Sequence, residues 1–269
     1  MNKPFFIQEP KLYNLIYSLK DYKKESEFIN SKIRNYNLTD PIILEIGSGT
    51  GNLTKYLIKG SKEYTSLEPN KEFFKYLKNK FKNHRNINLF NDTIQSFLQN
   101  KNTGNYDFVI ANFNVINYLN FKEFQDTMLQ LNKIVSKNSL VIFDTWSLEF
   151  VRNKPFKQES KNIYELSSNN KIKRYSKSDF KSKEDKIEIQ FSFSRINQKG
   201  TEELGLENHQ IYPYSLEKIK NFYTNVSKEW EIIYLKPYKE IKKEEIKTYK
   251  VNDFMKFRNW YVILRNLKT

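Results

Sequence analysis

The stretch from Pro41 to Leu57, PIILEIGSGTGNLTKYL, constrains the fold more than any other part of the chain. A run of branched apolar residues ends at Gly47, and two more glycines follow at alternate positions, Gly49 and Gly51. A helical pattern of apolar residues begins directly afterwards. This order predicts a buried strand, a tight glycine turn and a helix N-terminus, which together let the backbone approach a ligand closely.

Further apolar runs follow this turn, with helical segments between them. We expect a first strand at 42–46, then strands at 63–67, 86–90, 106–110 and 139–143, with helices at 52–59, 71–82 and 121–135. Strands separated by helices of this length form a parallel sheet covered on both faces. Right-handed crossovers make such a sheet doubly wound, with its ligand cleft at the carboxyl ends of the strands. Residues 9–35 predict two helices that pack on this body.

The pattern changes after Asp144, where short runs alternate polar and apolar residues. These runs lie at 157–167, 170–180, 186–196 and 203–212. Such alternation indicates antiparallel sheet with one face in water, which we interpret as a β-layer inserted over the cleft at 151–212. A helix at 215–225 and strands at 230–236 and 259–265 are expected to return to the main body, with a long connection at 237–253. The body would then comprise 1–150 and 213–269, including a helical cap at 1–36.

Composition excludes several classes of site. Cysteine is absent and histidine occurs twice, so disulfides and cysteine-based zinc sites are excluded and no metal is expected. No apolar run approaches the roughly 20 residues that span a bilayer, and the N-terminus lacks the apolar segment of a signal peptide. We therefore expect a cytoplasmic protein that has no membrane partner.

The net charge of +15 is the kind of excess that nucleic-acid binding requires. Residues 151–269 hold 26 Lys and Arg against 16 Asp and Glu, whereas residues 1–150 hold 20 against 15. A cationic β-layer would steer a phosphorylated acceptor such as a nucleotide-linked sugar toward the cleft. The alternative is an ordinary solvated surface in a chain that uses lysine throughout.

The glycine spacing is G-x-G-x-G, which differs from the G-x-G-x-x-G of dinucleotide-binding turns. The shorter spacing, with Glu45 directly before it, suits a smaller cationic ligand better than a pyrophosphate. Glu68 ends the second strand, where a carboxylate can accept both hydroxyl groups of a ribose. Asp92 after the third strand can accept a hydrogen bond from an adenine amino group, and Asn112 after the fourth can line the same pocket.

The motifs ILEIGSGTGNLT, SLEP, NDTI and YDFVIANFNVINYL resemble those of Rossmann-like, class I S-adenosylmethionine-dependent methyltransferases in order and spacing. The resemblance covers roughly residues 10–235. It implies an α/β fold with a doubly wound, mostly parallel seven-stranded sheet, N-terminal helices and the inserted antiparallel layer. It also implies S-adenosylmethionine in the cleft. The residues thereby assigned to the cofactor are Tyr22, Glu45, Gly47, Ser48, Gly49, Gly51, Asn52, Leu53, Glu68, Pro69, Asp92, Thr93, Ile94, Asn112 and Phe113.

Within this resemblance the three glycines would surround the methionine and ribose parts of the cofactor. Glu45 would lie near the amino group, and Glu68 would hold the ribose hydroxyl groups. Asp92, Thr93 and Ile94 would frame the adenine.

Three other segments narrow the resemblance to small-molecule methyltransferases, notably amino-sugar N-methyltransferases. YNLIYSLKDYKKESEFI is similar to their N-terminal YDxIYxxKDYxxEA pattern, while FDTWSLEFVRNKP and NHQIYPYSLEKIKNFY resemble the segments that enter and leave their β-layer. The chain departs from them at Asn14, where Asp is common, and at Gln210, where Arg is common. The likeness implies that Tyr22 touches the cofactor. The residues that it implies for the acceptor are Tyr13, Tyr17, Asn114, Trp146 and His209.

Methyl transfer from a sulfonium is an in-line displacement, so catalysis rests mainly on proximity and alignment. A neutral amine needs no strong base, whereas a hydroxyl acceptor needs one with a pKa near ambient pH. His209 is the candidate base because a histidine titrates in that range. Tyr17 is the second candidate catalytic residue.

We therefore predict a methyltransferase that acts on a small molecule, with a sugar or amino sugar as the preferred acceptor. One alternative is an RNA methyltransferase, although the sequence does not favour a nucleic-acid partner. Enzymes of that kind that act on exocyclic base amines usually carry D/N-P-P-Y/F after the fourth strand, where this chain reads ANFN. Another alternative is a non-catalytic protein that binds S-adenosylmethionine. The sequence is also compatible with a homodimer.

Overall fold

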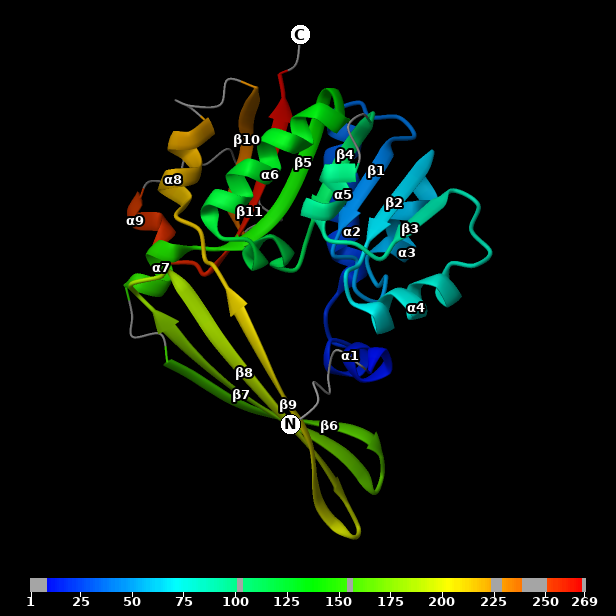
Figure 1. Ribbon diagram of the computed structural model, residues 1–269, viewed down its shortest axis with the longest axis vertical. Helices are drawn as coiled ribbons and strands as arrows, with labels where there is room; N and C mark the ends of the chain where they lie inside the picture. The colour runs from blue at the N-terminus through cyan, green and yellow to red at the C-terminus, as the bar shows by residue number, and fades with distance from the viewer. Residues whose placement is uncertain (1–8, 101–103, 154–156, 224–228, 239–250, 268–269) are drawn as a thin grey trace.

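The structure is a computed structural model and describes residues 9–100, 104–153, 157–223, 229–238 and 251–267. Its main body is a seven-stranded sheet with strand order β10-β11-β5-β4-β1-β2-β3 (Figure 1). Strands β1 to β5 pair in parallel, and β11 is antiparallel to both β5 and β10. The strand bounds are β1 (Ile42–Ile46), β2 (Glu63–Leu67), β3 (Ile87–Phe90), β4 (Tyr106–Ala111), β5 (Val135–Trp146), β10 (Trp230–Pro237) and β11 (Asn259–Asn266).

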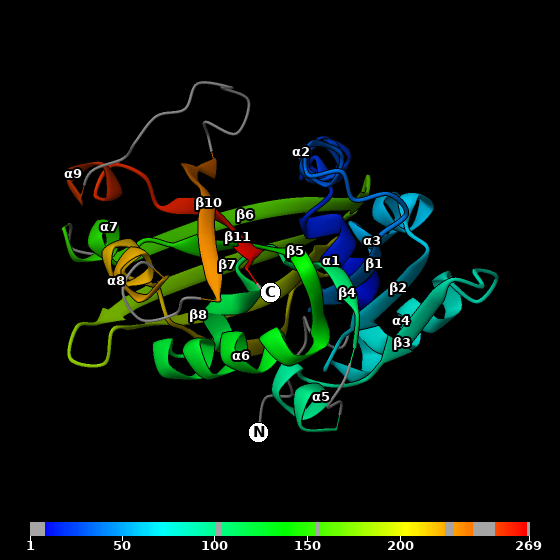
Figure 2. The ribbon, with the colours of Figure 1, turned by 90° about the horizontal axis from the view of Figure 1, so that it is seen from above.

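The central strands are buried on both faces because helices cover both sides of the sheet (Figure 2). In β4, Val109 and Ala111 enter one apolar core while Phe108 and Ile110 enter the other, as the period of two requires. The first core includes α5 (Ile94–Asn100), α6 (Phe121–Ile134), α8 (Leu216–Asn221) and part of α9 (Val251–Phe254). The second includes α2 (Tyr22–Asn35), α3 (Thr54–Leu57) and α4 (Lys71–Lys80).

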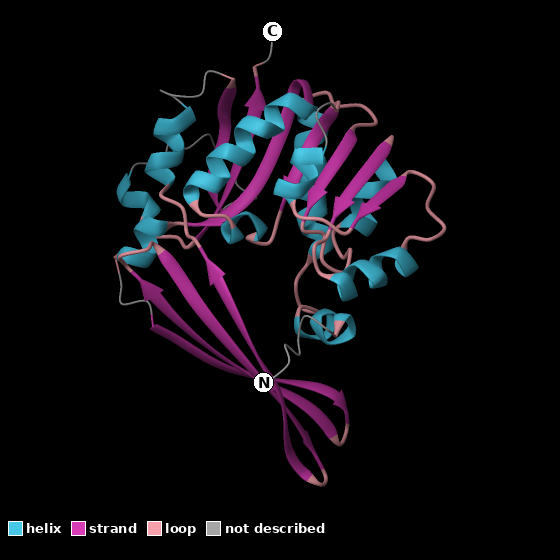
Figure 3. Cartoon of the chain, in the orientation of Figure 1, coloured by secondary structure: helices cyan, strands magenta, loops and turns pink. Residues whose placement is uncertain are grey.

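A separate four-stranded antiparallel sheet follows β5 and α7 (Leu148–Arg152). In Figures 1 and 3 it extends from the carboxyl-end edge of the parallel strands, beside α1 (Pro10–Ile16). Leu12 and Ile16 of α1 pack against Ile172 and Phe193 at the inner face of this sheet. The strands of this small sheet are β6 (Lys157–Ser167), β7 (Asn170–Lys181), β8 (Lys186–Asn197) and β9 (Gly200–Ile211).

The doubly wound α/β class with an added antiparallel layer is therefore confirmed. Three details differ from the expectation. Helices α5 and α7 were not predicted, because each has only about two turns and its apolar pattern is short. Strand β5 runs from 135 to 146 rather than 139 to 143, and the helix expected at 52–59 is a short α3 followed by a 3-10 turn, η2 (Ile58–Gly60).

Most of the predicted connection at 237–253 lies outside the described residues, which omit 239–250. Its last three residues belong to α9. Within the described ranges no helix is long and apolar enough to cross a membrane. The same ranges contain no cluster of three or more potential metal ligands.

Candidate active site

The glycine turn between β1 and α3 needs glycine at each of its three positions. Gly47, Gly49 and Gly51 have φ values of +67°, +58° and +68°, in the left-handed region that side chains disfavour. A Cβ atom on Gly47 would lie 2.6 Å from the Val115 side chain, whereas one on Gly49 would meet, among the described residues, only the Tyr13 hydroxyl group, at 3.9 Å. Gly49 therefore presents bare backbone to open space.

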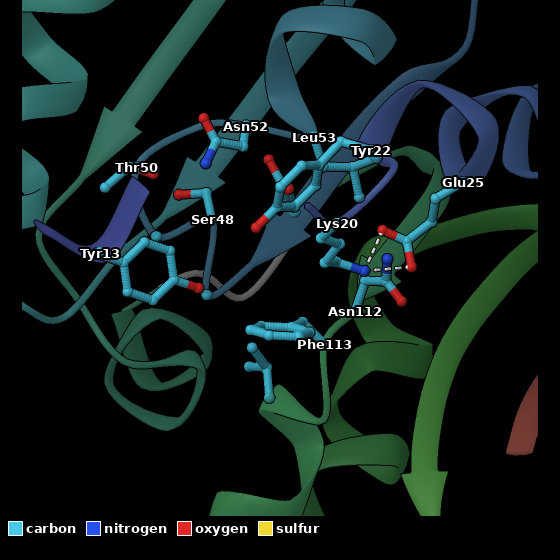
Figure 4. Close-up of a pocket in the computed structure, with 14 residues that line it drawn as sticks. Tyr13, Lys20, Tyr22, Glu25, Ser48, Thr50, Asn52, Leu53, Asn112 and Phe113 are labelled. Atoms are coloured by element: carbon cyan, nitrogen blue, oxygen red, sulfur yellow. Dashed lines mark hydrogen bonds and ion pairs between the residues drawn. The ribbon is translucent and has the colours of Figure 1, made fainter. Parts of the chain in front are cut away.

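That open space is a pocket between the glycine turn, the first two helices and the end of β4 (Figure 4). Ten of the residues that the sequence assigned to the site line it together, and four further residues complete the lining. The ten are Tyr13, Tyr22, Glu45, Gly47, Ser48, Gly49, Asn52, Leu53, Asn112 and Phe113; the four are Lys20, Glu25, Thr50 and Val115.

Glu68 stands at the end of β2 with both carboxylate oxygens engaged. Oε2 accepts a hydrogen bond from the Gly49 N–H at 2.7 Å, and Oε1 accepts one from the Asn70 N–H at 2.8 Å. Burial raises the pKa of Glu68, and these two hydrogen bonds oppose the rise. The carboxylate thus fixes the turn and keeps lone pairs for a further donor, since each oxygen can accept more than one hydrogen bond.

Glu45 lies beneath the turn and is held by two hydroxyl groups. Its Oε2 accepts hydrogen bonds from Thr54 Oγ1 at 2.6 Å and from the Tyr64 hydroxyl group at 2.9 Å. Burial raises the pKa of this carboxyl from 4.5 to about 7, although both hydrogen bonds lower it. The expected contact with a ligand amino group stays a prediction.

Replacing Glu45 by Gln should change how the stability of the ligand-free protein depends on pH. Because the folded pKa is about 7 against an ordinary 4.5, the carboxyl favours folding below about pH 4.5 and loses this contribution as pH rises through 7. Gln mimics the protonated acid, so Glu45→Gln should match the original protein at pH 5 and exceed its stability at pH 8 by roughly 2–3 kcal/mol. Urea unfolding at both pH values measures this. Glu27→Gln, at an exposed position of α2, is the control, and an equal difference at both pH values would contradict the prediction.

The floor of the pocket contains a buried ion pair that sequence reasoning missed. Lys20 Nζ lies 2.6 Å from Glu25 Oε2, and the two side chains are 14% and 2% exposed (Figure 4). The Tyr261 hydroxyl group lies 2.8 Å from both Glu25 Oε1 and Asn112 Oδ1, so the pair is tied to β11 and to the end of β4. The ammonium is also 4.9 Å from the Phe113 ring centroid, within cation–π range. Both charged residues belong to the KDYKKE motif, which was the available signal.

The backbone after β4 turns sharply at two consecutive residues. Phe113 and Asn114 have φ values of +67° and +58°. The Asn114 N–H donates to Asp144 Oδ1 at 2.7 Å, which holds this conformation. Burial raises the pKa of Asp144 from 3.8 to about 7. The turn lets Phe113 line the pocket and contact the Tyr17 ring edge to face, with 4.9 Å between centroids.

A second group of polar side chains lies where the residue after α1, Tyr17, meets the small sheet. We call it the sheet cluster, and it consists of Tyr17, Tyr118, Arg174, Glu207 and His209. The Tyr118 hydroxyl group is 2.8 Å from His209 Nδ1, and His209 Nε2 is 2.9 Å from Glu207 Oε1. The Arg174 guanidinium lies 6.0 Å from the Tyr17 ring centroid. Burial raises the pKa of Tyr17, and the neighbouring Arg174 lowers it.

The strand register explains why the side chains of Glu207 and His209 lie on one face of β9. They pair with Phe191 and Ile189 of β8, and alternate residues of a strand share a face. The period of two around His209 was therefore the signal that could have identified Glu207. Tyr118 lies in the 3-10 turn η3 (Val115–Tyr118), in the NVINYL segment, where nothing in the sequence singled it out.

The remaining predicted residues lie outside the pocket lining. Trp146, at the end of β5, packs with Ile189 and Val151 and has the Arg258 guanidinium 4.5 Å from its ring centroid. Asp92 Oδ1 accepts a hydrogen bond from the Thr93 N–H at 3.0 Å. The others are Gly51, Glu68, Pro69, Ile94 (in the apolar core at the start of α5), Asn114, and Tyr17 and His209 of the sheet cluster.

Comparison with known proteins gives two kinds of match. A family model described as ribosomal RNA adenine dimethylase matches residues 13–144. The ribosomal RNA small subunit methyltransferase A of Mycoplasmopsis synoviae (strain 53) is 26% identical over 127 residues, which is 44% of this chain and 48% of that protein. The corresponding protein of Mesomycoplasma hyopneumoniae (strain 232) is 33% identical over 73 residues, 27% and 28% of the two chains. The chain thus spans about half or less of the length of these relatives.

Solved structures match over nearly the whole chain. An S-adenosylmethionine-dependent methyltransferase from Clostridium acetobutylicum has a TM-score of 0.73 at 19% identity, covering 94% of both chains. An amino pentose methyltransferase from Micromonospora echinaspora has a TM-score of 0.72 at 13% identity, covering 95% of this chain and 97% of its own. A sugar N-methyltransferase from Streptoalloteichus has a TM-score of 0.69 at 12% identity, covering 93% and 92%. This chain has the class I S-adenosylmethionine-dependent methyltransferase fold, as its motifs predicted.

Proposed function

We propose that this chain binds S-adenosylmethionine and transfers its methyl group to a small acceptor, a sugar or amino sugar. The observation that carries the proposal is the glycine turn, in which Gly49 presents bare backbone to the pocket while Glu68 fixes that backbone from the end of β2. A turn of this kind accommodates a ligand that must lie against main-chain atoms.

Residues in the pocket and at the neighbouring strand ends suit the parts of this cofactor. Glu68 would accept hydrogen bonds from the ribose hydroxyl groups, and Asp92 would receive the adenine amino group. Lys20, Tyr22 and Phe113 would surround the amino-acid end. When bound, the cofactor supplies an electrophilic methyl group on a sulfonium. The protein's part is to hold the acceptor in line with it, an alignment worth up to roughly 7–11 kcal/mol in favourable intramolecular reactions.

The inner face of the small sheet supports a small polar acceptor. This face carries Arg174, Glu207 and His209. The strand pairing places further hydroxyl and amide side chains on the same face, namely Gln158, Ser160, Asn162, Ser176 and Ser178. Such groups form hydrogen bonds with sugar hydroxyl groups. The solved sugar methyltransferases also share the architecture over more than nine-tenths of both chains.

Ribosomal RNA is the second candidate acceptor. The family match and the net charge of +15 favour it. The match ends at residue 144, however, before the small sheet begins at 157. The segment after β4 also reads ANFN, without the prolines usual in enzymes that methylate exocyclic base amines.

Ligand-induced stabilisation tests the cofactor assignment. At one hundred times its dissociation constant, S-adenosylhomocysteine should stabilise the protein by about 2.7 kcal/mol. For a chain of this size this corresponds to a rise in Tm of roughly 5–10 °C. Adenosine alone should give a smaller rise. No shift with S-adenosylhomocysteine would refute the proposed function.

A transfer assay then separates the acceptors. The panel holds free and nucleotide-linked sugars, amino sugars, small amines and ribosomal RNA, each with labelled cofactor. We expect label on a sugar or amino sugar. Salt-sensitive transfer to RNA alone would instead establish the second candidate.

A further inference from the structure

We propose that Glu207 binds the ammonium group of an amine acceptor and that His209 removes the proton which this group loses before methylation. The inference rests on the proposed function and deepens it, because it selects nitrogen rather than oxygen as the reacting atom. It is carried by the sheet cluster and not by the cofactor pocket.

Glu207 is a buried carboxylate that lacks hydrogen-bond donors. Its side chain is 3% exposed, and neither of its oxygens has a hydrogen-bond partner among the residues that the structure describes. His209 Nε2 is close, at 2.9 Å from Oε1, but does not meet the geometry of a hydrogen bond. A buried carboxylate without hydrogen-bond donors is unfavourable. A ligand that supplies N–H donors and a positive charge would remove this cost.

The sheet cluster adjoins the pocket through Tyr17. Tyr17 connects the two, since its ring contacts Phe113 of the pocket and interacts with Arg174 of β7. Arg174 also lies 5.5 Å from the ring centroid of Phe191, which pairs with Glu207 in the small sheet. The charge of Glu207 raises the pKa of Tyr17. An ammonium held by Glu207 would therefore lie beyond Tyr17, on the side away from the glycine turn.

Five charged or titratable side chains surround Glu207. These are Tyr17 after α1, Tyr118 of η3, Tyr164 of β6, Arg174 of β7 and His209 of β9 itself. Arg174 is the fixed cation among them, and it interacts with the rings of Tyr17, Tyr164 and Phe191. His209 is therefore the candidate general base among them.

The proton balance follows from the contacts of His209. The bound R–NH3+ transfers one proton to Nε2, while Nδ1 is hydrogen-bonded to the Tyr118 hydroxyl group at 2.8 Å. The proton is then held on His209; Tyr118 beside it is 54% exposed as a residue, although burial raises the pKa of its hydroxyl group. The freed lone pair of R–NH2 forms the new N–C bond, and the C–S bond breaks with its electron pair remaining on sulfur. The products are R–NH2CH3+ and the thioether.

Paired acceptors test the role of Glu207. They are sugars that differ only in an amino or a hydroxyl group at one carbon, used free and nucleotide-linked. The original protein should methylate the amine of a pair, and Glu207→Gln should lower kcat/KM for it by at least about 100-fold. The stabilisation by S-adenosylhomocysteine should be unchanged. Glu203→Gln, at an exposed position of the same strand, is the matched control.

A pH profile tests His209 separately. In His209→Asn the rate at pH 7 should fall by roughly 100-fold or more, and the loss should shrink as pH approaches the pKa of the free amine. A residue with only a packing role would give a loss independent of pH.

Two outcomes would overturn the inference while the cofactor assignment stands. One is stabilisation by S-adenosylhomocysteine with methylation of hydroxyl groups or RNA but of no amine. The other is an amine activity that Glu207→Gln leaves intact. Absence of stabilisation would instead mean failure of the proposed function itself.

Discussion

Gly49→Val is expected to abolish binding of S-adenosylhomocysteine while the protein still folds. Of the residues that the structure describes, only Tyr13 places an atom, its hydroxyl group, within 4 Å of a Cβ atom at this position, so the valine methyl groups would enter the pocket without disrupting the core. Its φ of +58° adds strain of about 1–2 kcal/mol for an L-residue. Affinity should fall by at least about 100-fold, measured by calorimetric titration and by loss of the ligand-induced rise in Tm.

Gly60→Ala is the matched control. A Cβ atom there has no atom of the described part of the chain within 4 Å, and the backbone is not in the left-handed region. This variant should bind like the original protein. Retained binding by Gly49→Val would show that the ligand does not approach the turn.

Glu68→Ala should have the second-largest effect. It leaves the N–H groups of Gly49 and Asn70 without their acceptor and removes the proposed partner of the ribose. Hydrogen bonds to charged groups contribute about 1.5–3 kcal/mol each, so loss of cofactor affinity should reach roughly 100-fold or more. Glu68→Gln keeps one accepting oxygen and should lose less, about tenfold.

Glu63→Gln provides the comparison, because Glu63 is exposed at the opposite end of the same strand. It should bind the ligand normally. Equal affinities for Glu68→Ala and Glu63→Gln would remove Glu68 from the site.

The parallel body was predictable because its signals are local. The apolar run before Gly47 and the stripe of α4 each depend on neighbours within one element. Ten of the residues that the glycine turn and the family resemblance assigned to the site line one pocket. The class of fold was thus accessible without knowledge of any long-range contact.

The sheet cluster and the ion pair of the pocket were less accessible because they depend on tertiary contacts. Tyr118 and His209 are 91 positions apart, and Glu25 and Tyr261 are 236 apart. Burial is also a tertiary property: Glu207 and Glu203 belong to the same strand, yet only Glu207 is buried. The period of two around His209 pointed to Glu207, but the burial that distinguishes Glu207 from Glu203 could not be read from it.

Helix α1 connects the two candidate sites mechanically. The Asn14 side chain accepts hydrogen bonds from Thr50 Oγ1 at 2.6 Å and from Asn52 Nδ2 at 2.8 Å, so one side of the helix is fixed to the glycine turn. Leu12 and Ile16 fix the other side to the small sheet. Seven residues are too few for a stable helix alone, so these contacts set its position. A ligand in the cofactor pocket that orders α1 would therefore also order the residues of α1 that face the small sheet. By linkage, the cofactor and the acceptor would then change each other's affinity by the same factor.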